Sequence, residues 1–158
     1  MPSLSDEWNT PKWLAERVGQ FDFDPCSNSR SHIDALDFAS LENGDDGLVL
    51  DWHGSVWINP PYSNPLPWMD KLRVEIDGGR CREAMALVKL DTSTKWWKAL
   101  TLNKDFVSLW LFNNRLRFEP PPGVKASSNN FCSALVHYRR YGRDLKLDDV
   151  AQLWIAPP

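Results

Sequence analysis

The chain has 158 residues, of which 42% are hydrophobic and 25% charged, with a formal net charge of -3 and a pI near 5.6. This composition is typical of a globular protein, and it argues against a disordered chain and against a protein that coats nucleic acid through overall positive charge. The length predicts one domain, residues 1–158, with a single core. Because no apolar stretch could span a bilayer and the N-terminus lacks signal-peptide features, we expect a soluble intracellular protein with no membrane partner.

The first elements in chain order are a helix and a short strand. Thr10 and Pro11 have the pattern of an N-cap and a first-turn proline, followed by a helix that ends near Gly19. The alternating residues FDFD at 21–24 predict a strand that stops at Pro25, because proline cannot donate to a sheet ladder.

The middle of the chain continues this alternation. Residues 48–52 and 55–59 predict strands, residues 66–78 a helix, residues 84–90 a buried strand, and residues 93–102 another helix. Alternation of this kind favours an α/β fold.

The last third of the chain is rich in strand patterns instead. They cover residues 106–112, 115–118, 131–141 and 151–158, and the proline-rich segment 119–130 joins two of them. We therefore expect a mostly parallel sheet flanked by helices, with an antiparallel hairpin near the C-terminus.

The cysteines and histidines predict no metal site. None of them has the paired spacing of a zinc or redox motif; they are Cys26, Cys81, Cys132, His32, His53 and His137. We expect free thiols and chemistry that needs no metal.

The apolar run VWI at 56–58 leads directly into Asn59, Pro60, Pro61 and Tyr62. The prolines must end the strand, and the carboxyl edge of an open parallel sheet is where ligands bind. A plain turn is one interpretation. The other is a loop that holds a planar amino group for methylation.

The residue types of this loop suit that second interpretation. An amino group conjugated to a ring is a poor nucleophile, because its lone pair is delocalised. The Asn59 side-chain oxygen and a neighbouring backbone carbonyl can accept its hydrogens and direct the lone pair toward a methyl donor. The prolines fix the carbonyl direction, and Tyr62 offers a face on which the target ring can stack.

These four residues resemble motif IV of the amino-group S-adenosylmethionine-dependent methyltransferases. The wider chain resembles the small phage-type, Dam-like DNA N6-adenine methyltransferases. The matching stretches are DEWNTPKWL at 6–14, FDFDPCS at 21–27, DDGLVLDW at 45–52, VWINPPYS at 56–63, LDTSTKWW at 90–97 and NRLRF at 114–118. The resemblance implies a Rossmann-like, single-domain methyltransferase fold, with S-adenosyl-L-methionine as the cofactor.

The resemblance also implies roles for individual residues. The catalytic loop would be Asn59, Pro60, Pro61 and Tyr62. The cofactor-binding residues would be Trp8, Thr10, Pro11, Asp24, Pro25, Cys26, Ser27, Asp46, Gly47 and Leu48. The segment DPCSNS lacks the glycines that many methyltransferases have there, and the ribose-holding carboxylate could be Asp34, Asp37 or Glu42.

The partner implied by the resemblance is double-stranded DNA with the target base rotated out of the duplex. Candidate DNA-binding residues are Arg115, Lys125, Arg139 and Arg140, and base contacts are expected from loops such as 63–67 or 119–130.

The expected function is site-specific methylation of adenine N6 in DNA, by a phage or prophage protein in the cytoplasm of a bacterial host. Cytosine N4, RNA adenine and protein glutamine are alternative substrates, because each presents a planar nitrogen. A further alternative is a non-catalytic DNA-binding relic of the same fold, which the missing glycines favour.

Overall fold

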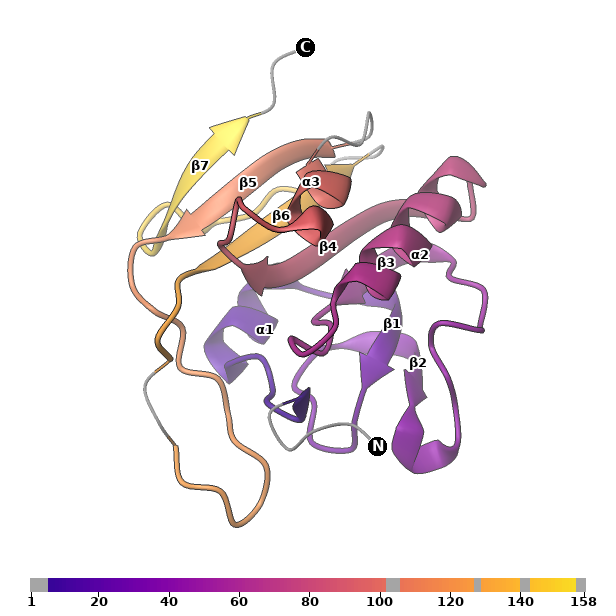
Figure 1. The fold of residues 1–158 in the computed structure, drawn as a ribbon, viewed down its shortest axis with the longest axis horizontal. Coiled ribbons are helices and arrows are strands. Elements are labelled where there is room, and N and C mark those ends of the chain that lie inside the picture. The colour runs from indigo at the N-terminus through magenta and orange to yellow at the C-terminus, as the bar shows by residue number, and fades with distance from the viewer. Residues whose placement is uncertain (1–5, 102–105, 127–128, 140–142, 156–158) are drawn as a thin grey trace.

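The computed structural model describes residues 6–101, 106–126, 129–139 and 143–155. The described chain forms a seven-stranded sheet in the order β2-β1-β3-β4-β6-β5-β7 (Figure 1). The strands are β1 (Phe21–Ser27), β2 (Ala35–Ser40), β3 (Gly54–Ile58), β4 (Cys81–Lys89), β5 (Phe106–Phe112), β6 (Ser133–Arg139) and β7 (Ala151–Ile155). The helices are α1 (Lys12–Val18), α2 (Leu66–Asp77) and α3 (Lys95–Thr101), with a short 3-10 helix over Leu41–Asn43.

The sheet has a parallel half and an antiparallel half. Strands β2, β1, β3 and β4 pair in parallel, whereas β4 with β6, β6 with β5, and β5 with β7 pair antiparallel. The expected antiparallel hairpin near the C-terminus is confirmed by β5 and β6, but antiparallel pairing extends over three strand pairs, so the sheet is mixed rather than mostly parallel. No helix lies between β5 and β7 in the described residues, and without a crossover the consecutive strands fold back on each other.

Helices cover the two faces of the sheet, and alternate residues of β3 face each side. Val56 and Ile58 join a core cluster with residues of α2 and α3 such as Met69. Trp57 joins a second cluster with Leu14 of α1. Alternation is the expected result of the two-residue period of a strand.

The predicted helices and most predicted strands are present, with some differences in their ends. Strand β1 continues through Pro25 to Ser27 rather than stopping at Pro25, and its register with β2 shifts between Asp24 and Ser27. A proline is tolerated at such an irregularity because no regular ladder donor is needed there.

Two predicted strands are absent, and one strand was not predicted. Residues 48–52 form a turn and an irregular stretch instead of a strand. The buried indole of Trp52 donates to the carbonyl of Gly47 at 2.7 Å. Residues 115–118 are irregular, although Leu116 and Phe118 are buried. Strand β2 was not predicted, because most of its residues are exposed at the sheet edge and lack the pattern of a buried strand.

Strand β1 lies between β2 and β3, so the chain crosses to opposite sides of β1 in successive connections. Ligands of open α/β sheets bind at the carboxyl ends of the strands beside such a reversal. The strand order therefore predicts a ligand site among the loops that follow β1, β2, β3 and β4. Among the described helices, none is both long and apolar enough to cross a membrane.

Candidate active site

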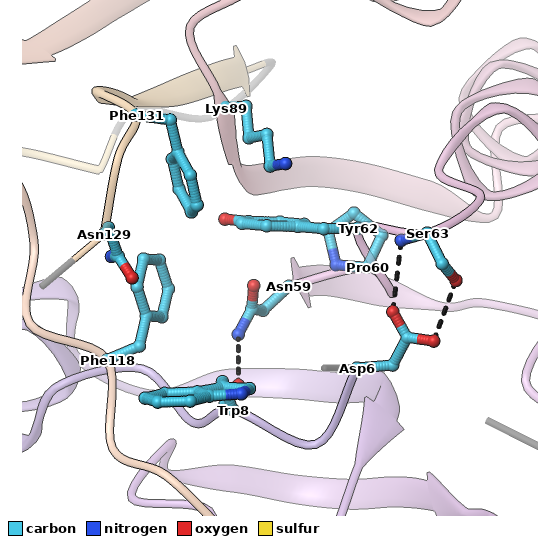
Figure 2. A pocket seen from close by; sticks show the side chains of 10 residues that line it. All are labelled: Asp6, Trp8, Asn59, Pro60, Tyr62, Ser63, Lys89, Phe118, Asn129 and Phe131. Carbon is cyan, nitrogen blue, oxygen red and sulfur yellow. Dashed lines mark hydrogen bonds between the residues drawn. The ribbon is translucent and has the colours of Figure 1, made fainter. Parts of the chain in front are cut away.

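Two pockets lie at the carboxyl ends of the parallel strands and share the loop that follows β3. The first, here called the Asn59 pocket, is drawn in Figure 2 and is lined by Asp6, Trp8, Asn59, Pro60, Tyr62, Ser63, Lys89, Phe118, Asn129 and Phe131. The second, here called the Glu42 pocket, is lined mainly by residues 25–28, 39–42 and 45–47. Pro60 lines the first and Pro61 the second, so the loop forms a wall between them.

The side-chain amide of Asn59 has a defined orientation. Its Nδ2 donates to the backbone carbonyl of Trp8 and to Oγ1 of Thr10, both at 3.4 Å. A carbonyl oxygen can only accept, so the nitrogen rather than the oxygen must face Trp8. Figure 2 shows the amide oxygen on the side away from Trp8, toward Tyr62.

Tyr62 belongs to an aromatic wall of the Asn59 pocket. Its hydroxyl donates to the carbonyl of Leu87 in β4 at 3.2 Å, and burial raises the pKa of the phenol far above its usual range. Its ring packs edge-on against Phe118 and Phe131, with centroid separations of 5.8 and 5.6 Å. The Nζ atom of Lys89 lies 4.6 Å from the Phe131 ring centroid, which places a cation beside these rings.

Asp24 lies behind the Glu42 pocket rather than in its lining. It is only 3% exposed, its carboxylate accepts from the backbone nitrogen of Cys26 at 3.1 Å, and burial raises its pKa to about 7. Burial also raises the pKa of the Cys26 thiol, which donates to the backbone carbonyl of Asn59 at 3.2 Å. The carboxyl end of β1 is therefore tied directly to the loop after β3.

Gly47 allows a close backbone approach within the Glu42 pocket. A Cβ atom at Gly47 would lie 1.8 Å from the carbonyl oxygen of Pro25, far inside any tolerated contact. The nearby Asp46 accepts from the backbone nitrogen of Leu48 at 3.0 Å and lines the pocket, whereas Leu48 does not. Gly47 thus lets its loop pack directly against the carboxyl end of β1.

Of the three acidic residues considered for the ribose, Glu42 alone lines the Glu42 pocket. Its carboxylate accepts from the backbone nitrogen of Ser29 at 2.8 Å and from the Ser29 hydroxyl at 3.2 Å. Asp34 instead accepts from Gln20, and Asp37 faces His53. The exposed side chain of Leu41 adds an apolar surface to the same pocket.

The resemblance implies cofactor contacts for Trp8, Thr10 and Pro11, but none of the three lines the Glu42 pocket. Trp8 lines the Asn59 pocket, and the Thr10 hydroxyl meets the Asn59 amide. Pro11 is the N-cap of α1 and lines neither pocket. No side chain caps this helix, so the prediction of Thr10 as an N-cap is wrong.

The candidate DNA-binding residues do not form one group. Arg115 and Lys125 are exposed on segment 113–132, which also supplies Phe118, Asn129 and Phe131 to the Asn59 pocket. The backbone of Arg139 pairs with Glu83, at the end of β4 opposite to the pockets. Arg140 lies outside the described residues.

Several pocket residues were missed by sequence reasoning. Lys89 could have been found, because it ends a buried strand at the carboxyl edge. Phe118 and Phe131 carry no local signal that would connect them with Tyr62. Asp6 carries none either, although its carboxylate accepts from the backbone nitrogen and the hydroxyl of Ser63 at 3.1 and 2.8 Å. Within the described ranges, no cluster of three or more metal-ligating side chains is found.

Comparison with known proteins provides independent evidence on the family. The chain is 30% identical over 141 residues to a DNA N-6-adenine-methyltransferase of Haemophilus phage HP1 (strain HP1c1), covering 85% of this chain and 79% of the relative. It is 28% identical over 102 residues to a DNA N-6-adenine-methyltransferase of Escherichia phage T1, covering 60% of this chain and 40% of the relative. Residues 2–151 match the family described as DNA N-6-adenine-methyltransferase (Dam). The chain therefore belongs to the DNA N-6-adenine-methyltransferase (Dam) family.

Proposed function

We propose that this protein transfers a methyl group from S-adenosyl-L-methionine to N6 of adenine in DNA. Family membership supports the reaction class. The observation that carries the assignment to residues is the wall formed by Asn59, Pro60, Pro61 and Tyr62 between two pockets. A methyl donor on one side and an acceptor amine on the other would meet across this loop.

The residues of the Glu42 pocket fit the proposed cofactor. The Glu42 carboxylate of this pocket can accept from the ribose hydroxyls of the cofactor, and Leu41 and Trp68 offer apolar surface to its adenine ring. Gly47 lets its loop pack directly on the Pro25 carbonyl beside this pocket, and a Cβ atom there would clash with that carbonyl. When bound, S-adenosyl-L-methionine would supply a methyl group on a positively charged sulfur. Asp24 would act indirectly, by holding the backbone of Cys26.

The residues of the Asn59 pocket fit a flipped adenine. Asn59 Oδ1 would accept one hydrogen of the target amine, and the Pro60 carbonyl would accept the other. This draws the nitrogen toward tetrahedral geometry and directs its lone pair across the loop. The aromatic wall around Tyr62 would stack the base. No strong base is required, because the amine proton becomes acidic once the nitrogen is alkylated.

Segment 113–132 is the proposed DNA-facing element. It supplies aromatic residues to the acceptor pocket and carries Arg115, Arg117 and Lys125, which are exposed. Exposed cations beside the pocket into which the base must rotate can position the phosphate backbone.

We further propose that the chain is one domain with a Rossmann-like methyltransferase fold. The order of strands reverses at β1, and the two pockets lie at the carboxyl edge beside that reversal. The alternative of a non-catalytic relic, which rests on the missing glycines, predicts no methylation in the test below.

The test is mass spectrometry of nucleosides from duplex DNA incubated with the protein and methyl-labelled S-adenosyl-L-methionine. The expected product is labelled N6-methyladenine, and labelled N4-methylcytosine or unlabelled DNA would contradict the proposal. Asn59→Ala should retain cofactor and DNA affinity within a few fold, whereas methylation should fall roughly a hundredfold, as when a transition-state hydrogen bond is removed.

A further inference from the structure

We propose that Thr10 is a positioning residue that holds the Asn59 amide against the Trp8 carbonyl, with the amide oxygen facing the acceptor amine. This inference rests on the proposed function, because it assigns the amide oxygen to the methylation step. It adds a residue that acts on the substrate only through Asn59.

The contacts of the Asn59 amide support this role. Its nitrogen is 3.4 Å from Thr10 Oγ1 and 3.4 Å from the Trp8 carbonyl oxygen, so two acceptors lie on the same side of the amide. Thr10 is only 4% exposed, which leaves little water to replace its hydroxyl. Figure 2 shows the nitrogen toward Trp8 and the oxygen turned away from it, on the side of Tyr62.

Thr10 has no competing structural task at the start of α1. A threonine before a proline and a helix commonly caps the helix with its hydroxyl. Here the N-cap is Pro11, and no side-chain capping bond is present. The hydroxyl instead accepts a hydrogen bond from the side-chain amide of Asn59, in the loop that follows β3.

Orientation matters because the two ends of an amide are chemically opposite. An oxygen toward the pocket accepts a hydrogen of the target amine, whereas a flipped amide would present two N–H donors to an amine that must itself donate. The flipped form would also set the amide oxygen against the Trp8 carbonyl. The Trp8 carbonyl, which can only accept, therefore sets the reactive orientation, and the Thr10 hydroxyl adds a second hydrogen bond that holds the amide there.

Thr10 can hold the amide firmly because the preceding residue, Asn9, is anchored on two sides. The backbone of Asn9 exchanges two hydrogen bonds with Glu119, each at 2.9 Å. Its side chain exchanges two more with that of Asn28, at 3.1 and 2.6 Å. Glu119 lies on segment 113–132 and Asn28 lines the Glu42 pocket, so Thr10 is held from both sides of the site.

The test compares Thr10→Val, which removes the hydroxyl at similar shape, with Thr10→Ser, which keeps it. In steady-state methylation, we expect Thr10→Val to lower kcat roughly five- to tenfold with KM for DNA and cofactor within twofold, which is the scale of one lost hydrogen bond. Thr10→Ser should remain within twofold of the wild type. In an Asn59→Ala background, Thr10→Val should have no further effect, because the amide through which it acts is gone.

A second readout does not depend on turnover. In ¹H–¹⁵N spectra, the Asn59 side-chain amide is assigned as the pair lost in Asn59→Asp. Thr10→Val should shift this pair, and Thr10→Ser should shift it less. Unchanged kcat in Thr10→Val with an active wild type, or an unshifted amide pair, would overturn the role of Thr10. A wild type that methylates no DNA would instead overturn the proposed function, and the amide pair would still report whether Thr10 contacts the Asn59 amide.

Discussion

Asn59 and Tyr62 are three positions apart, yet different parts of the chain hold them. The Asn59 amide contacts Trp8 and Thr10 from the N-terminal segment, whereas the Tyr62 hydroxyl bonds to β4. The Tyr62 ring packs on segment 113–132. Substitutions at the two positions should therefore separate hydrogen bonding to the amine from capture of the base.

Tyr62→Phe and Tyr62→Ala should have different effects. The phenylalanine variant keeps the ring and loses the bond to the Leu87 carbonyl, so it should stay active and lose about 1 kcal/mol of unfolding free energy. The alanine variant removes the stacking surface and should raise KM for DNA by roughly tenfold or more. Urea unfolding and steady-state kinetics measure the two effects. Equal loss of activity in both variants would assign the essential role to the hydroxyl instead.

Asp24 predicts a pH dependence of stability. Its buried carboxyl has a pKa raised to about 7, against about 4 in the unfolded chain, so between these values the folded state holds a proton that the unfolded state has lost. The contribution of Asp24 is fully present below pH about 4 and is lost as the pH rises through about 7.

The wild type and Asp24→Asn should be compared by urea unfolding between pH 4 and pH 8. The difference in unfolding free energy isolates Asp24, because all other titrating groups are shared. We expect the wild type to lose on the order of 3 kcal/mol relative to the variant over this range. A pH-independent difference would show that the Asp24 pKa is not raised in the folded state.

At the scale of elements, segment 113–132 helps to line the Asn59 pocket, and its described part has no regular helix or strand. Two hydrogen bonds join its ends. The Arg115 side chain donates to the backbone carbonyl of Asn129 at 3.2 Å, and the Asn129 side chain donates to the backbone carbonyl of Leu116 at 2.5 Å. Long loops of this kind in compact domains are commonly functional. The anchored ends hold Phe118 and Phe131 against Tyr62, while Arg117 and Lys125 between these ends stay exposed.

Removing the exposed charges of this segment should weaken DNA binding. Arg117→Ala combined with Lys125→Ala should lower affinity for duplex DNA several-fold and flatten the dependence of log affinity on log salt by about one to two units. Fluorescence anisotropy over a salt series measures both quantities. Lys146→Ala is the matched control, because Lys146 is an exposed cation on another part of the chain. An equal slope in all three proteins would place the DNA on a different face.

At the scale of the whole molecule, one sheet supports both pockets and both core clusters. The clusters lie on opposite faces of the same strands, and alternate residues of β3 and β4 contribute to each. The proposed single domain should therefore lose its two clusters together.

Thermal unfolding should be one cooperative transition. Far-ultraviolet circular dichroism and tryptophan fluorescence should give coincident curves, because Trp52 and Trp97 belong to one cluster and Trp57 and Trp110 to the other. The calorimetric and van't Hoff enthalpies should agree. Two separated transitions would contradict a single domain.

Local patterns were sufficient for much of the fold and for the central loop of the candidate site. The helix over Leu66–Asp77 and the strand over Cys81–Lys89 follow from patterns within their own residues. The stop after Ile58 follows from two adjacent prolines, and the roles proposed for Asn59 and Tyr62 follow from their residue types and neighbours. These features depend on sequence-adjacent residues, so a single chain is enough to predict them.

The tertiary structure decided how this loop is completed. It assigned Thr10 to Asn59 rather than to a helix cap, brought Phe118 and Phe131 to Tyr62, and placed Glu42 in the second pocket while Asp34 and Asp37 face elsewhere. Each of these pairings joins residues from different segments of the sheet edge. Their physical cause is the order in which the strands assemble and the loops pack on one another, and no local periodicity or capping pattern records that order.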